Sequence, residues 1–366
     1  MMTYKSLGNI ATYINGYPFK PEDRGNIGLP IIRIQDLTGN AYDLGFYDGE
    51  YPSRIEINDG DVLISWSASL GVYVWNRGRA LLNQHIFKVV FDKAEVDKQY
   101  FVYAVQYKLK EMEAKTHGAT MKHIIKKDFD NTMIPFPDIR EQSRIADKLS
   151  RVEKVIAKRQ DQLRKLDELM KARFAELFGD PVADSKGWGQ VPLKQMLESI
   201  RYGTSTPPAF AEDGYCFIRA TNIKNGRIVK NDMKYISQYE ADRLEKCKLF
   251  GGEVLIVRSG VNAGDTCVIT DEYIGQYAGY DMILVMKDEM NPIFLNELIN
   301  TEYMNKVVKP LTRRAAQPHL NSEQVQSFPI IKVPKYLQDE FADFVKQINK
   351  SKLLEERQVG FIAKIR

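Results

Sequence analysis

Side chains of the kinds that bind bases gather in short polar stretches in both halves of the chain. In the first half of the chain these loops contain Arg33, Gln35, Ser65, Ser67, Ser69, Asn83, Gln84, His85, Lys115, His117, Thr120, Lys122 and His123. In the second half they contain Tyr202, Thr204, Ser205, Arg219, Thr221, Asn222, Arg258, Ser259, Asn262, Arg313, Arg314, Gln317 and His319. Arg, Lys, Asn, Gln, Ser and Thr contact base edges and phosphates. Any one of these loops taken singly is more typical of solvated polar sequence, but their matching positions in the two halves predict a surface for double-stranded DNA.

Two of these residues allow a second interpretation. Arg33 and Arg219 lie inside apolar segments, where an arginine packs its stem and pairs with a carboxylate. They are candidates either for DNA contact or for a structural ion pair.

A search for catalytic residues gives no coherent site. Asn291-Pro292-Ile293-Phe294 is similar to the N-P-P-[YF] sequence of adenine methyltransferases, but its second proline is missing and Pro292 is typical of a helix start. No G-x-x-x-x-G-K-[ST] loop and no H-E-x-x-H pair is present, and the four histidines have no metal spacing. We therefore expect a chain that is non-catalytic by itself and binds neither metal nor cofactor. Its formal charge of +4 does not indicate a partner.

A long helix is predicted over residues 138–178, a stretch with neither Gly nor Pro. Apolar residues recur there at coiled-coil spacing, interrupted by Arg159 and Arg173. Pro135 and Pro137 precede the helix, and Gly179-Asp180-Pro181 should end it. A second, weaker pattern near the end of the chain loses its register at Lys352 and Glu355. The predicted seam comprises Ile145, Leu149, Val152, Ile156, Leu163, Leu166 and Met170 in the first helix, and Phe341, Val345 and Ile348 in the second.

The chain also repeats itself. The pattern G-x-x-[IF]-I-R-x-x-[DN]-[LI] occurs at 28–37 and again at 214–223, and G-[DE]-V-L-I followed by Ser occurs at 60–67 and 252–259. Each half then has one predicted helix, over 98–113 and 294–308. These matches recur in the same order, which indicates an internal duplication.

The predicted fold is mixed α/β, with two globular target recognition domains separated by long helices. The expected segments are a first recognition domain at 1–137, a spacer helix at 138–179, a second recognition domain at 180–335 and a second, shorter helix at 336–366. Antiparallel packing of the helices would relate the domains by approximate two-fold symmetry and fix their separation.

Bulk features favour a cytoplasmic protein. No run of about 18 apolar residues is present, and the first residues lack the apolar stretch of a signal peptide. The three cysteines, Cys216, Cys247 and Cys267, are spaced too far apart for a Cys-x-x-Cys site and are expected to be reduced.

The chain resembles the specificity (S) subunits of Type I restriction–modification systems over essentially its whole length. The resemblance rests on the two repeated patterns, on Asn83-Gln84-His85, on the loop 118–124, and on residues 134–137 followed by Glu141-Gln142. The second half differs, because Gln276-Tyr277-Ala278 is only a loose substitute for the Asn-Gln-His segment and Leu337-Gln338 replaces Glu-Gln.

The resemblance implies a DNA specificity subunit whose two recognition domains each read one half of a bipartite asymmetric target. It also implies helices that set the gap and dock two methyltransferase (M) subunits, with restriction (R) subunits as further partners. S-adenosylmethionine, ATP and Mg²⁺ would be bound by those partners, which would carry adenine-N6 methylation and ATP-dependent cleavage. Two alternatives remain at this point: a coiled-coil scaffold without DNA specificity, and a fragment of a fused restriction–methylation enzyme.

Overall fold

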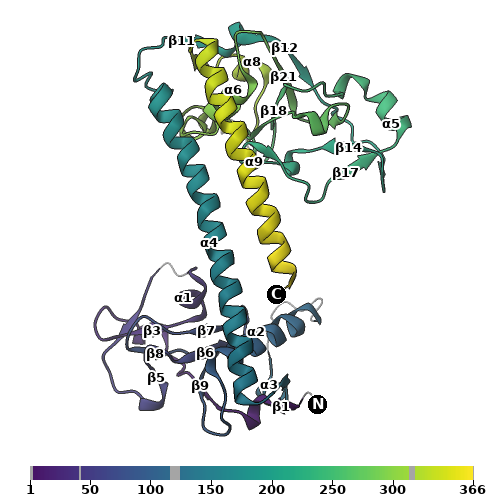
Figure 1. Ribbon diagram of the computed structural model, residues 1–366. Helices are drawn as coiled ribbons and strands as arrows, with labels where there is room; N and C mark the ends of the chain where they lie inside the picture. Colours follow the sequence, from purple (N-terminus) through teal and green to yellow (C-terminus); the bar gives the residue numbers. More distant parts are fainter. Residues whose placement is uncertain (1–2, 41–42, 116–123, 313–317, 366) are drawn as a thin grey trace. The chain divides into compact units, whose positions relative to one another are not determined.

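The computed structural model describes residues 3–40, 43–115, 124–312 and 318–365, without the side chains of 113–115 and 361–365. The chain divides into two compact units, one ending at Val155 and the other running from Ile156 to Ile365. Each unit has one globular part built of sheets and short helices, which we call the first head and the second head. The 40-residue helix α4 (Ile139–Phe178) continues from the first unit into the second (Figure 1). Within the described ranges, no helix is long and apolar enough to cross a membrane.

Two four-stranded sheets form the first head. The antiparallel sheet has the order β2 (Thr12–Asn15), β9 (Ile86–Val90), β6 (Val62–Ser65), β7 (Gly71–Val74). The mixed sheet has the order β4 (Phe46–Tyr47), β3 (Leu29–Ile32), β8 (Ala80–Leu82), β5 (Glu56–Ile57). The remaining elements are β1 (Tyr4–Ser6), which pairs with β10 (Met133–Pro135), the helices α1 (Ile34–Thr38), α2 (Lys98–Lys115) and α3 (Lys126–Asp130), and the 3₁₀ turns η1 (Leu7–Asn9), η2 (Pro21–Asp23) and η3 (Ser53–Ile55). Val62, Phe87, Phe101 and Phe129 join sheet and helices in one core.

The second head has the same plan. Its antiparallel sheet has the order β12 (Leu197–Tyr202), β21 (Met282–Met286), β18 (Val254–Ile256), β19 (Thr266–Val268), and its mixed sheet has the order β13 (Phe210–Ala211), β17 (Lys234–Ile236), β14 (Tyr215–Ile218), β20 (Tyr277–Ala278). The strand pairs β11 (Gln190–Pro192) with β22 (Pro329–Ile331) and β15 (Ile223–Lys224) with β16 (Arg227–Ile228) complete its strands. Its helices and turns are η4 (Leu193–Met196), η5 (Ala220–Asn222), α5 (Gln238–Arg243), η6 (Glu245–Cys247), η7 (Asp271–Tyr273), α6 (Pro292–Ile299), the π-helical turn η8 (Met304–Val308), α7 (Lys309–Thr312) and α8 (Ser322–Gln326).

The strand pairing confirms the predicted duplication. β6 and β18 each lie second from one edge of an antiparallel sheet, between a hairpin partner and the strand that precedes the next helix, α2 in the first head and α6 in the second. In each mixed sheet one pair is parallel: Ile31 lies beside Leu81 in the first head, and Phe217 lies beside Tyr277 in the second. Parallel pairing requires a crossover connection, so its recurrence at the same place is a specific sign of a repeated fold.

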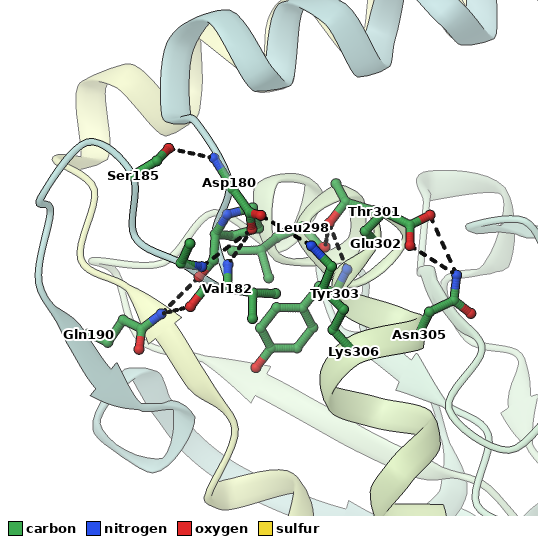
Figure 2. Close-up of polar contacts among 12 residues, drawn as sticks. Asp180, Val182, Ser185, Gln190, Leu298, Thr301, Glu302, Tyr303, Asn305 and Lys306 are labelled. Atoms are coloured by element: carbon green, nitrogen blue, oxygen red, sulfur yellow. Dashed lines mark hydrogen bonds and ion pairs between the residues drawn. The ribbon is translucent and has the colours of Figure 1, made fainter.

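The single helix predicted over 294–308 is observed as two helical pieces, α6 and η8, with an interruption between them. Asn291 does cap the start of α6, because its side-chain oxygen accepts hydrogen bonds from the amides of Ile293 and Phe294. After Ile299, however, Thr301 Oγ1 donates to the Leu298 carbonyl at 2.8 Å and accepts from the Tyr303 amide at 3.2 Å (Figure 2). A short polar side chain that bonds to the local backbone competes with helical hydrogen bonds, so the chain turns before η8 and α7.

Helix α4 ends where the sequence predicts. Gly179 follows it with a positive φ of 74°, and Asp180 then caps the next turn, accepting from the Val182 amide at 2.8 Å. Asp180 also pairs with Lys306 Nζ at 3.2 Å, so the end of α4 is attached to η8 (Figure 2). The hydrogen bond from Val182, opposed by burial and aided by Lys306, lowers the pKa of Asp180.

In the second unit, α9 (Lys335–Ile365) runs antiparallel to the part of α4 that belongs to that unit (Figure 1). Phe174 packs on Phe341 with ring centroids 5.5 Å apart, whereas Arg159, earlier in α4, bonds to Glu355, later in α9, at 2.8 Å. Arg159 and Glu355, which interrupt the heptad pattern, therefore pair with each other. The buried Lys352 likewise pairs with Asp167, and Arg173 with Glu340 at 2.9 Å.

The predicted seam is buried unevenly. Phe341, Val345 and Ile348 on α9 are buried, and Phe341, Val345 and Met170 belong to or pack against the core of the second head. The remaining seam residues are half-buried; they are Ile145, Leu149, Val152, Ile156, Leu163 and Leu166. The helices are thus held most firmly where they join the second head.

A buried glutamine attaches the start of each long helix to its head. Gln142 Oε1 accepts from the Asp97 amide at 3.0 Å, and its Nε2 donates to the Pro137 carbonyl at 2.8 Å. Gln338 repeats this: its Oε1 accepts from the Asn291 amide at 2.8 Å, and its Nε2 donates to the Val333 carbonyl at 2.8 Å. The second copy has Leu-Gln in place of Glu-Gln, but it keeps the glutamine that makes these hydrogen bonds. The preceding residue takes no part in them.

Candidate nucleic-acid interface

In the second head, the end of β18 presents Arg258 between two aromatic rings. Its guanidinium carbon lies 4.7 Å from the ring centroid of Tyr202, at the end of β12, and 4.7 Å from that of Tyr280, just before β21. Both tyrosines are about two-fifths exposed, at 40% and 42%. Stacking on aromatic faces orients a guanidinium without using its hydrogen-bond donors. Among the described residues, no carboxylate pairs with Arg258, and its buried Nε has no hydrogen-bond partner.

A buried carboxyl group, that of Asp281, is bonded to the backbone of Arg258. Asp281 is 1% exposed, and its Oδ1 accepts from the Arg258 amide at 3.3 Å. Its Oδ2 finds no hydrogen-bond partner within the described part of the chain. Burial raises the pKa of Asp281 to about 7, with the Arg258 amide acting in the opposite direction. The carboxyl group therefore titrates near neutral pH.

The loop after Arg258 is fastened to the segment that returns before α8. Ser259 Oγ and His319 Nδ1 share a hydrogen bond of 2.7 Å, the Gly260 amide donates to the Pro318 carbonyl at 3.1 Å, and the Leu320 amide donates to the Arg258 carbonyl at 2.8 Å. These bonds bring together Arg258, Ser259 and His319, which the sequence placed in two separate loops.

The first head uses the same frame with different side chains. The Leu320 bond to Arg258 is matched by the Ile124 amide, which donates to the Trp66 carbonyl at 3.1 Å. Trp66 therefore stands where Arg258 stands in the second head. Its ring lies 5.0 Å from that of His85 and stacks on Phe87 at 5.5 Å. An aromatic cluster thus replaces the stacked cation.

The counterpart of Asn83-Gln84-His85 is Gly279-Tyr280-Asp281, not Gln276-Tyr277-Ala278. The Asn83 amide donates to the Ile32 carbonyl at 3.0 Å, and the Gly279 amide donates to the Ile218 carbonyl at 2.7 Å. Tyr277 and Ala278 form β20 and so match β8 instead. Sequence reasoning therefore missed Tyr280 and Asp281; the similarity of 282–286 to 86–90 is the signal that would have set the register.

A close glycine contact marks the same place in both heads. A Cβ on Gly16 would lie 2.0 Å from the Asn83 carbonyl oxygen, and one on Gly203 would lie 1.6 Å from that of Gly279. Only glycine allows such an approach of two backbones. In each head this contact brings the end of the first sheet strand against the turn that carries the candidate residues.

Arg33 and Arg219 have matching structural partners. Arg33 Nε bonds to Asp36 at 3.0 Å and its Nη2 to Asp43, while Arg219 Nη2 bonds to Asp232. Each arginine begins a helical turn directly after its strand. The structural alternative accounts for these contacts, and a role in DNA binding stays a prediction.

The other predicted residues differ in exposure. Gln35, Ser69, Gln84, Ser205 and Thr221 are exposed; Asn83, Thr204 and Asn262 are half-buried, like Arg258, Ser259 and His319; Ser65, Ser67 and Asn222 are buried. Ser65 Oγ donates to the Ser69 carbonyl at 2.5 Å, and Asn222 donates to two carbonyls of its own loop, so both hold loops in shape. The predicted residues outside the described side chains are Lys115, His117, Thr120, Lys122, His123, Arg313, Arg314 and Gln317.

A metal site is not formed by any group of His, Cys, Asp and Glu within the described residues. A cavity of about 570 Å³ lies in the second unit between α4, α6, α9 and the β15–β16 hairpin. Its lining carries both signs of charge, from Lys171 and Arg227 to Asp167 and Glu297, and gives no set of ligands for one chemical class.

Comparison with known proteins gives one consistent family. The model described as Type I restriction modification DNA specificity domain matches residues 2–171 and 185–359. The chain is 24% identical over 357 residues to the Type I restriction enzyme EcoBI specificity subunit of Escherichia coli, which covers 88% of this chain and 74% of that relative. It is 22% identical over 298 residues to the MjaVIII specificity subunit of Methanocaldococcus jannaschii; the match covers 77% of this chain and 69% of that relative.

Solved structures share the fold. A Type I restriction–modification S subunit from M. genitalium superposes with a TM-score of 0.62 at 15% identity, covering 100% of this chain and 94% of that chain. A second solved chain comes from work on complex assembly and conformational transition of the type I R-M system. It superposes with a TM-score of 0.56 at 18% identity, covering 99% of this chain and 95% of that chain.

Proposed function

Because this chain belongs to the family of Type I restriction–modification DNA specificity domains, we propose that its two heads each read one half of a bipartite, asymmetric DNA target. The chain would be the specificity subunit of such a complex. It would be non-catalytic by itself and would supply sequence recognition to its partners.

The observation that carries this proposal is the stacked Arg258. A guanidinium that lies between Tyr202 and Tyr280, with no carboxylate partner in the described part of the chain, keeps its two terminal nitrogens available for a ligand, whereas its Nε is buried. Arg33 and Arg219 contrast with it, since their guanidinium groups are already bonded to Asp36, Asp43 and Asp232. A bidentate contact of arginine with the O6 and N7 atoms of guanine is the commonest specific contact in the major groove.

Differences between the heads support an asymmetric target. Trp66 with His85 in the first head and Arg258 with Asp281 in the second occupy matching positions on the repeated frame. Aromatic and cationic groups select different base features, so two heads with one fold would prefer different half-sites.

The proposal extends to partners and cofactors. The long helices α4 and α9 would dock two methyltransferase subunits and set the gap between the half-sites, and restriction subunits would join the assembly. S-adenosylmethionine, ATP and Mg²⁺ would belong to those subunits, which would flip the target adenine from the duplex and methylate it.

The test is a methylome. This chain would be co-expressed with its methyltransferase subunit, and N6-methyladenine would be mapped by single-molecule sequencing, with the methyltransferase alone as the control. We expect a two-part motif with a fixed gap that is methylated only when this chain is present. Methylation that does not change when the chain is removed would contradict the proposal and favour the scaffold alternative.

A further inference from the structure

The loop that follows Arg258 exposes an apolar side chain almost completely. Val261 is 96% exposed, and none of the described residues covers it. A single exposed apolar residue is ordinary on a protein surface, so exposure alone does not indicate a binding site. The place at which Val261 is held makes it informative.

The backbone on both sides of Val261 is fixed. The Gly260 amide donates to the Pro318 carbonyl at 3.1 Å, and the Ala263 amide donates back to the Gly260 carbonyl at 3.0 Å, closing a tight turn around Val261. The Asp265 amide donates to the Asn262 carbonyl at 2.9 Å, and the Gly264 amide to the Val257 carbonyl at 2.8 Å. Each of these bonds joins atoms within the loop or ties it to the returning segment, so the tip has a defined shape.

The two apolar residues of this turn have opposite environments. Ala263 is 6% exposed, and a Cβ on the neighbouring Gly264 would lie 2.5 Å from Val308 of η8. The inner side of the loop is therefore packed against the head, while Val261 is left outside. Folding gains almost nothing from a valine at this position, because the side chain buries almost no surface.

The neighbours of Val261 are polar groups suited to base edges. Arg258 and Ser259 precede it, Asn262 follows it, and His319 is bonded to Ser259 at 2.7 Å. The major groove offers one apolar feature among these polar edges, the 5-methyl group of thymine. A methyl-bearing side chain at the tip of a rigid loop, next to hydrogen-bonding residues, fits that feature.

We infer that Val261 contacts the 5-methyl group of a thymine in the half-site that the second head reads. This inference rests on the proposed function and names one base that the head selects. The contact would be apolar and would exclude water, so its loss would weaken binding by the value of about one buried methyl group, roughly fourfold.

The test uses the full chain in complex with its methyltransferase subunits and duplexes carrying the mapped target. Each thymine of the second half-site is replaced in turn by deoxyuridine, which lacks only the 5-methyl group, and Kd is measured by fluorescence anisotropy. For the wild type, we expect one replacement to raise Kd about fourfold. For Val261→Ala, that same replacement should have less than about a twofold effect, because the methyl group has lost its partner.

Matched controls separate the outcomes. Val74→Ala changes an exposed valine of the first head and should leave the deoxyuridine penalty unchanged. Replacements in the first half-site should be insensitive to Val261→Ala. The inference is overturned if the second half-site contains no thymine, if the wild type tolerates every replacement there, or if Val261→Ala keeps the full penalty. It is also overturned if Val261→Ala weakens thymine and deoxyuridine duplexes equally, as a wedge between bases would. Failure of the wild type to bind the target specifically would instead refute the proposed function.

Discussion

Removing the hydrogen bonds of the buried Gln338 should destabilise the second unit strongly. Gln338 is 2% exposed, and its side chain makes three bonds: it accepts from the Asn291 amide at 2.8 Å and donates to the carbonyls of Val333 at 2.8 Å and Glu289 at 3.0 Å. Gln338→Met keeps the length and much of the volume of the side chain but makes none of these bonds. With about 1 kcal/mol for each lost bond, the free energy of unfolding of this unit should fall by about 3 kcal/mol.

Hydrogen exchange measured by mass spectrometry localises this effect. Amides of β22 and of the first turns of α9 should exchange about a hundredfold faster in Gln338→Met than in the wild type. Gln347→Met, an exposed position on the same helix, is the matched control and should change stability by less than about 0.5 kcal/mol. The corresponding change in the first unit, Gln142→Met, removes the two bonds to Asp97 and Pro137 and should cost about 2 kcal/mol. Equal exchange in Gln338→Met and Gln347→Met would refute the view that this glutamine attaches α9 to the head.

Three further predictions concern charged groups of the second unit. Because burial raises the pKa of Asp281 to about 7, the folded state retains a proton that the unfolded state loses near pH 4; unfolding free energy should therefore fall by up to about 1.4 kcal/mol per pH unit between pH 4 and 7, and Asp281→Asn should abolish this slope in urea titrations. Asp180, whose pKa is lowered, should stabilise the fold above pH 4 and lose that effect in acid, so the cost of Asp180→Ala, about 1 kcal/mol at pH 7, should vanish as the pH falls through its folded pKa. Asp167→Ala should cost about 2 kcal/mol in thermal unfolding because it removes the ion pair of the buried Lys352 ammonium, whereas Lys352→Met should be neutral or stabilising. The reverse order would contradict this reasoning.

The long helix and the duplication could be predicted because both follow from short-range patterns. A stretch without Gly or Pro, with apolar residues at heptad spacing, and a stop at Gly179 fix α4 within one residue of its observed start and end. The sequence also shows the charged residues that interrupt the heptad pattern, but it does not show that Arg159 and Glu355 pair with each other. Arg159 and Glu355 meet only because the helices run antiparallel, which brings together residues far apart in sequence.

The candidate site was predicted in part. The sequence shows which side chains could bind DNA, but not which of them are already bonded to other residues of the chain. Arg33, Arg219 and Arg258 follow strands in similar contexts, yet the first two are paired with Asp43 and Asp232 and the third is stacked on tyrosines. Those partners come from other segments, so only the folded chain distinguishes the three arginines.

Tyr280 and Asp281 were missed for a related reason. Their counterparts in the first head are Gln84 and His85, which share no side-chain chemistry with them, and loops of unequal length hide the register. The equivalence is carried by backbone bonds, such as that from Gly279 to Ile218, which leave no mark on the sequence.

Arg258→Ala tests whether each head reads its own half of the target. The methylome of cells that express this variant with the methyltransferase subunit would be compared with that of the wild type. We expect the motif to relax at one or two positions of a single half-site, with a loss of about 1–3 kcal/mol in binding and an unchanged gap and other half. Relaxation of both half-sites together, or no change in the motif, would show that the two heads do not read separate halves.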